Sequence, residues 1–123
     1  MEWYMTTQSF ESLRVWHLAR LLTVRIYSVA RQDSFARDFG LRDQICRASI
    51  SVMSNIAEGY ERESRKEFVH FLRIARGSAA EVRAQLYAAQ DLEYLDPAIA
   101  RDLRRDALAL SKQLASLTSQ LRG

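Results

Sequence analysis

The chain has 123 residues, 48% of them hydrophobic and 27% charged, which is typical of one folded domain and excludes a disordered chain. One proline and four glycines are too few for the many turns of a β-sandwich or barrel, so the composition predicts long helices. Eighteen basic and fifteen acidic residues leave a net charge of +3, and all but two of the basic residues are arginines. Arginine recognises phosphate well, although the codon bias of a GC-rich genome would give the same composition.

The cysteine content and the N-terminus indicate where the protein works. Cys46 is the only cysteine, so no disulfide can form within the chain and a reducing compartment is expected. The first residues lack the basic and apolar regions of a signal peptide, and no apolar run is long enough to cross a bilayer. We therefore expect a cytoplasmic protein with no membrane contact. It would have a flexible segment over residues 1–8 and one helical domain over residues 9–123.

The first predicted helix begins at Ser9, a residue type favoured at N-caps, and continues to about Arg31. On a wheel of about 100° per residue, one apolar face contains Val15, Ala19, Leu22 and Ile26. A second apolar stripe on the opposite side contains Phe10, Leu13, Leu21 and Val24. One stripe is enough for a helix of a monomer, so the second stripe predicts a partner.

The second predicted helix runs from about Leu41 to Glu58, and Gly59 is expected to end it as a C′ glycine. The connection before it, Gln32 to Gly40, has no sustained period and is expected to hold Phe35 and Phe39 against the core. The predicted core face contains Leu41, Ile45, Ala48, Val52 and Ile56. A second apolar stripe contains Cys46, Ile50, Met53 and Ala57.

Two further helices are marked by their N-terminal signals. A capping box from Ser64 to Glu67 starts a helix that runs to about Leu92. Its predicted core face contains Phe68, Phe71, Leu72, Ala75, Ala79, Val82, Leu86 and Ala89. Asp96 and Pro97 are typical of an N-cap and a first helical position, and they start the last helix. Its apolar seam contains Ile99, Leu103, Ala107, Leu110, Leu114, Leu117 and Leu121.

Four amphipathic segments with short connections predict an all-α fold, an antiparallel up-and-down four-helix bundle. The two-sided helices predict that this bundle forms a homo-oligomer. The residues expected at the oligomer interface are Leu13, Leu21, Val24, Ile50 and Met53. As an alternative, the connection over residues 32–40 and the N-terminal segment could cover these stripes within one chain.

Several short motifs occur in a fixed order along the chain. They include Leu13-Arg14-Val15-Trp16, Asn55-Ile56-Ala57-Glu58-Gly59 and Ile74-Ala75-Arg76-Gly77-Ser78. From about Phe10 to Leu121 the chain resembles the small four-helix-bundle proteins encoded by intervening sequences of bacterial 23S rRNA genes. That resemblance implies a homopentameric, barrel-like assembly that associates with RNA or the ribosome. A more distant similarity is to accessory subunits of retroelement reverse transcriptases, which are basic pentamers that bind nucleic acid.

Basic residues gather on one side of each of the last two predicted helices. In the third helix an arc of about 100° contains Arg65, Lys66, Arg73, Arg76 and Arg83. In the fourth helix a row opposite the leucine seam contains Arg101, Arg105 and Lys112. Positive charge along one face is what binding to a phosphate backbone requires, so these residues are the predicted nucleic-acid-binding site. A solvated surface, or pairing with acids of a neighbouring subunit, would explain the same pattern.

No residue pattern in the chain indicates catalysis. Asn55, Glu58 and Gly59 are expected to form a structural corner between the second and third helices, because a catalytic carboxylate needs a titratable partner and a cleft. Glu67 and His70 have the Glu-x-x-His spacing of di-iron bundles, but the spacing occurs once and falls off the core face. We therefore expect no metal, no cofactor, no small-molecule substrate and no enzymatic activity.

The sequence thus favours a non-enzymatic oligomeric scaffold that binds structured RNA or a ribonucleoprotein through arginine-rich helix faces. The alternative is a protein-interaction module or accessory subunit that makes no direct contact with nucleic acid.

Overall fold

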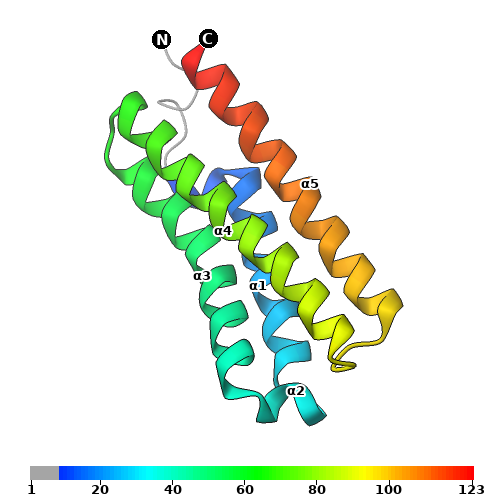
Figure 1. The fold of residues 1–123 in the computed structure, drawn as a ribbon. Helices are drawn as coiled ribbons and strands as arrows, with labels where there is room; N and C mark the ends of the chain where they lie inside the picture. The colour runs from blue at the N-terminus through cyan, green and yellow to red at the C-terminus, as the bar shows by residue number, and fades with distance from the viewer. Residues whose placement is uncertain (1–8) are drawn as a thin grey trace.

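A computed structural model describes residues 9–123, and within that range the chain is helical and contains no strand (Figure 1). A 3₁₀ turn, η2 (Phe10–Ser12), precedes α1 (Arg14–Ala30), α2 (Asp33–Arg37), α3 (Phe39–Glu61), α4 (Arg65–Asp91) and α5 (Pro97–Arg122). The four long helices pack as a bundle in which α1 contacts α3, α3 contacts α4, α4 contacts α5, and α5 contacts α1. None of the helices in this range is long and apolar enough to cross a membrane. The predicted flexible segment, residues 1–8, lies outside the described residues.

The predicted apolar faces form the core of the bundle. Ala19 and Ile26 of α1, Val52 of α3 and Leu114 of α5 are completely buried. Ile99 is an exception, because the buried seam of α5 starts at Ala100 and continues with spacings of three and four residues through Leu103. The prediction for Ile99 was therefore wrong by one position on the helix.

The first helix starts later than predicted, and this changes the environment of Leu13. The side chain of Ser9 caps no helix, and the turn η2 separates it from α1. Leu13 is the N-cap of α1 in an extended conformation, and it is only 4% exposed. It lines a groove with Leu117 of α5. The prediction that Leu13 lies on an exposed interface was wrong, because the turn removes Leu13 from the helical periodicity of α1.

The connection between α1 and α3 contains the short helix α2. Phe35 of α2 is completely buried and stacks on Tyr94, with 5.5 Å between the ring centroids. Phe39 was also expected in the core, but it is 64% exposed because α3 already begins there and directs its ring outwards. The guanidinium group of Arg42 covers that ring, 4.7 Å from its centroid. Only one of the two phenylalanines therefore anchors the connection.

Gly59 is needed for helix packing and does not end a helix. α3 continues to Glu61, and the turn is made by Glu63, whose φ is 55°. A Cβ atom on Gly59 would lie 2.5 Å from the Cβ of Phe71 in α4. The prediction of a terminating glycine was wrong, because the close approach of α4 is what excludes a side chain at this position. The predicted cap of α4 is confirmed, since the hydroxyl of Ser64 accepts a hydrogen bond from the Glu67 N–H.

One carboxylate joins the two loops at the α2 end of the bundle. Asp38 caps α3 by accepting a hydrogen bond from the Leu41 N–H at 3.1 Å. Its other oxygen accepts a hydrogen bond from the Tyr94 hydroxyl at 2.9 Å. Both bonds stabilise the charged carboxylate, so the pKa of Asp38 is lowered, chiefly by the Leu41 N–H and then by Tyr94. The pKa of Tyr94 is raised, chiefly by the same hydrogen bond.

The substitution Gly59→Ala is expected to destabilise the protein by about 1–3 kcal/mol, because the new methyl group overpacks the contact with Phe71. Gly77→Ala is the matched control, since a Cβ there meets no atom within 4 Å. That control should stabilise by about 0.5–1 kcal/mol through helix propensity. Urea unfolding followed by circular dichroism measures both, and equal effects of the two variants would contradict the packing role of Gly59.

The lowered pKa of Asp38 predicts a contribution to stability that depends on pH. Because the folded pKa lies below the unfolded value, the contribution is present above the unfolded pKa and is lost as the pH falls through the folded pKa. Tyr94→Phe removes one of the two hydrogen bonds and should raise the pKa of Asp38. Carboxyl NMR titration measures this shift, with Tyr87→Phe as the control. An Asp38 pKa that is unchanged in Tyr94→Phe would show that the hydroxyl does not stabilise the carboxylate.

Candidate nucleic-acid interface

The two predicted rows of basic residues lie on α4 and α5, two helices that pack against each other (Figure 1). Arg104 of α5 shows which sides of the two helices face each other. Its guanidinium group donates a hydrogen bond to Gln90 of α4 at 2.7 Å and lies 4.1 Å from the ring centroid of Tyr87. Arg76 and Arg83 lie on the same side of α4 as Tyr87, because they precede it by three turns and about one turn. The basic row of α4 therefore borders α5.

We define the α4–α5 basic face by the cations that α4 and α5 carry beside this contact and on the outer side of α5. Eight of them were predicted, namely Arg65, Lys66, Arg73, Arg76, Arg83, Arg101, Arg105 and Lys112. Arg83 is half-buried and the others are exposed. The structure adds Arg104 and Arg122, which the sequence analysis missed because both lie next to the leucine seam of α5. Arg104 and Arg122 are 18 residues apart, which is five full helical turns, and this spacing could have placed both on the same side of α5.

Two of the five acidic residues of α4 and α5 pair with arginines outside these helices, and Asp91 lies five turns after Arg73 on the same side of α4. Glu67 pairs with Arg62 at 3.4 Å, and Asp106 pairs with Arg25 of α1. Glu81 lies roughly 140° around α4 from Arg76. Asp102 is 3.9 Å from Arg105, but both side chains are largely exposed, so this pair contributes little. In the described part of the chain, no ion pair neutralises the Arg73–Arg76–Arg83 row.

A groove of about 600 Å³ lies at the end of this face, between the start of α4 and the end of α5. Its apolar floor is formed by Val69 and Leu121, which are buried. Its charged rim is formed by Arg65, Lys66, Arg73 and Arg122. His70 also lines it and meets the ring of Phe71 edge-on. Among residues 9–123, no acidic side chain lines this groove, so its chemistry is that of an anion-binding surface.

The corner between α3 and α4 is structural. Arg62 pairs with Glu58 at 3.0 Å, and its guanidinium group lies over the ring of Phe71. Glu58 therefore helps to hold the turn, as predicted. Asn55 does not reach the corner, since its amide donates to the carbonyl and the hydroxyl of Ser51, one turn earlier in the same helix. The expectation that Asn55 satisfies the ends of the helices was wrong.

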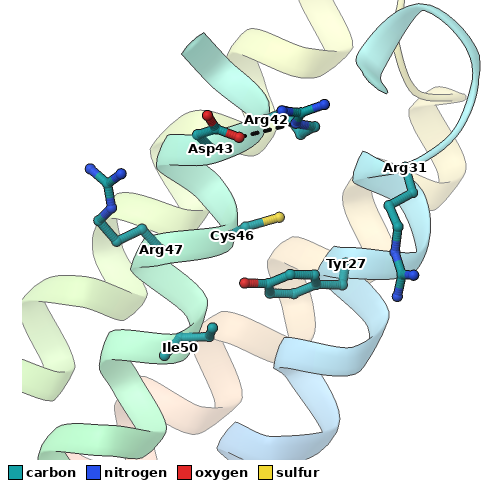
Figure 2. Close-up of a pocket in the computed structure, with 7 residues that line it drawn as sticks. All are labelled: Tyr27, Arg31, Arg42, Asp43, Cys46, Arg47 and Ile50. Atoms are coloured by element: carbon teal, nitrogen blue, oxygen red, sulfur yellow. Dashed lines mark hydrogen bonds and ion pairs between the residues drawn. The ribbon is translucent and has the colours of Figure 1, made fainter. Parts of the chain in front are cut away.

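A second groove of about 690 Å³ lies between α1 and α3 (Figure 2). The ring of Tyr27 extends from α1 towards α3, and the sulfur of Cys46 points back towards α1 (Figure 2). Burial raises the pKa of the Cys46 thiol, which keeps the thiol protonated and weakly nucleophilic. The prediction that Cys46 packs as a small hydrophobic residue is confirmed by its burial.

The predicted oligomer interface divides into exposed and covered residues. Leu21, Val24 and Ile50 are 55%, 62% and 41% exposed, whereas Met53 is half-buried against the core. Leu21 lies in a groove between α1 and α5, and Ile50 lies in the groove between α1 and α3. The exposed apolar residues therefore lie on both sides of α1. Among the residues that the structure describes, no group of three or more His, Cys, Asp or Glu side chains could hold a metal ion.

Comparisons with known proteins identify the family. Residues 11–116 match the family model of 23S rRNA-intervening sequence proteins. No curated protein matches the chain. A similar solved structure is that of a protein of unknown function from the S23 ribosomal protein family of Bacteroides thetaiotaomicron VPI-5482. That protein is 26% identical, with a TM-score of 0.78 over 85% of this chain and 97% of its own chain. The chain therefore belongs to the family of 23S rRNA-intervening sequence proteins.

Proposed function

We propose that this protein is a non-enzymatic scaffold that binds structured RNA, or a ribonucleoprotein, through the α4–α5 basic face. The observation that carries the proposal is that two packed helices carry ten basic residues against five acidic ones, two of which pair with arginines of other segments. A phosphate backbone released from its counterions by such a face binds with strong dependence on salt. The ribosomal family name of the Bacteroides protein supports RNA as the partner.

The chemistry of the face supports binding and not proton transfer. Guanidinium groups stay protonated at all ordinary pH values, so they hold anions but cannot act as general acids or bases. The proposal therefore includes no cofactor and no small-molecule substrate. It also retains the cytoplasm as the compartment, where a chain with a single buried thiol needs no disulfide partner.

We further propose that the chain forms an antiparallel up-and-down bundle that assembles as a homo-oligomer, with the pentamer that the family resemblance implies as the expected form. Leu21, Val24 and Ile50 support self-association, because they expose apolar area on both sides of α1. Each added subunit brings a further charge of +3, so assembly would raise the positive potential around the complex.

Replacing Arg73, Arg76 and Arg83 together by alanine should weaken RNA binding without unfolding the protein. The dependence of log K on log salt should become shallower by about 2–3, because three phosphate contacts are lost. Fluorescence anisotropy with a labelled, folded RNA at several salt concentrations measures both effects.

The matched control replaces Arg14, Arg31 and Arg37, which lie on α1, the turn after it and α2 and are also exposed. This control removes the same charge and should keep the salt dependence of the wild type. A wild-type protein that captures a protein partner independently of salt, and does not bind RNA, would favour the accessory-subunit alternative.

Light scattering at micromolar concentration should give a mass that is a multiple of the 14.2 kDa chain. Val24→Glu and Ile50→Glu should each shift the protein to the monomer, because a carboxylate is costly to bury in an apolar contact. Leu92→Glu changes an equally exposed apolar residue in the loop after α4 and should leave the mass unchanged. A wild-type mass of 14.2 kDa would contradict self-association.

A further inference from the structure

We infer that the α4–α5 basic face binds the double helix of RNA and not single strands. This inference deepens the proposed function and rests on it. Two observations support the inference. Arginine side chains lie over the exposed aromatic rings, and the cations lie on two helices that the core holds at a fixed distance.

The face offers no open platform on which bases could stack. Proteins that bind single strands stack successive bases on exposed aromatic rings. Among the described residues the exposed aromatic rings of Phe and Tyr are those of Phe39 and Tyr87. Phe39 belongs to α3 and lies under Arg42, away from the face. Tyr87 lies on the face, but the guanidinium group of Arg104 covers its ring at 4.1 Å.

The cover over Tyr87 is itself held in place. Arg104 is anchored by its 2.7 Å hydrogen bond to Gln90, three residues after Tyr87. On the side of the ring that Arg104 covers, a base could stack only by displacing this guanidinium group and breaking that bond. His70 supplies one further ring at the end of the face, next to Phe71. Two separated rings do not form the continuous platform that a single strand requires.

The cations form two rows at a fixed separation. The row on α4 extends from Arg65 to Arg83, about 27 Å at 1.5 Å per residue, and the row on α5 from Arg101 to Arg122 is about 32 Å long. Packed helices lie about 8–10 Å apart. The core holds this spacing, since Leu72 and Leu86 of α4 pack in the same fully buried cluster as Leu110 and Leu114 of α5.

A double helix is the partner that matches two rigid rows. Its two backbones have a fixed separation, so both rows can contact phosphates without ordering the RNA first. A flexible single strand could follow only one row and would lose conformational entropy on binding. Double-stranded RNA is recognised mainly by shape and by contacts to phosphates and 2′-hydroxyl groups, which suits a face of arginines.

The test compares one RNA duplex of about 16 base pairs, the span that double-stranded RNA-binding domains cover, with each of its two strands. The strands are designed to remain unstructured, and all three RNAs carry the same dye at the same salt concentration. We expect the duplex to bind at least tenfold more tightly than either strand. Equal or tighter binding of a strand would overturn this inference and leave the proposed function intact, whereas no binding of any RNA would overturn both.

Three variants locate the contact. Ala80→Glu places a carboxylate on the exposed side of α4 between Arg76 and Arg83 and should weaken duplex binding at least tenfold. Ser54→Glu, on the exposed side of α3, makes the same change of charge and should have no effect. Tyr87→Leu should change duplex affinity less than twofold, because no base stacks there. A loss of about five- to hundredfold, the usual effect of removing a stacking ring, would contradict the inference even if the duplex binds best.

Discussion

The close contact between α3 and α4 determines how α4 is oriented, and the orientation of α4 determines where its charges lie. Gly59 allows the backbone of α3 to approach Phe71, where any side chain would collide. Further along the same contact, the Ser78 hydroxyl donates a hydrogen bond to the Ser51 hydroxyl at 2.9 Å. With this side of α4 fixed against α3, the side that carries Arg76 and Arg83 must face α5 and solvent.

Several carboxylates pair with groups outside the α4–α5 basic face, whereas on that face Arg105 has a weak, exposed pair with Asp102. Asp106 pairs with an arginine of α1, Glu58 and Glu67 both pair with Arg62 at the turn, and Asp38 caps α3 while it accepts from Tyr94. Of these carboxylates, Asp106 belongs to α5 and Glu67 to α4. The two helices together carry ten basic and five acidic residues, so their net charge of +5 exceeds the +3 of the whole chain.

Helical periodicity was sufficient to predict the four long helices and nearly all of the core. A long run of apolar residues at three- and four-residue spacings fits a helix with one buried face and no other element. It failed where the period is absent or too short. The five residues of α2 cannot show a period, so Phe35 and Phe39 could not be distinguished. Leu13 was misplaced because the wheel of α1 was extended through a turn. From the sequence alone, Gly59 was expected to end its helix, which is the usual role of a glycine after an apolar run. Its packing role depends on the position of Phe71 in α4, which the sequence does not give.

The basic rows were also predicted from periodicity, but their adjacency was not. A wheel gives the faces of one helix, and the rotation of one helix against another is set by packing. Arg104 and Arg122 were missed for the same reason. Both lie next to the leucine seam, so the wheel of α5 alone places them at the edge of the core. Only the contacts of Arg104 with Tyr87 and Gln90 show that the edge of this seam borders α4.

The order of helix contacts around the bundle relates the proposed RNA-binding face to the proposed oligomer interface. Since α1 packs against α3 and α5, and α4 packs against α3 and α5, the side formed by α1 and α3 lies opposite the side formed by α4 and α5. Ile50 lies on the side formed by α1 and α3, so self-association through Ile50 would leave the basic face of every subunit open to solvent, whereas Val24 lies in a groove between α1 and α5. Several equal faces on one assembly would bind one long RNA with an avidity well above the affinity of a single face. In such an assembly, a weak, sequence-independent phosphate contact in each subunit would be sufficient for stable binding by the whole.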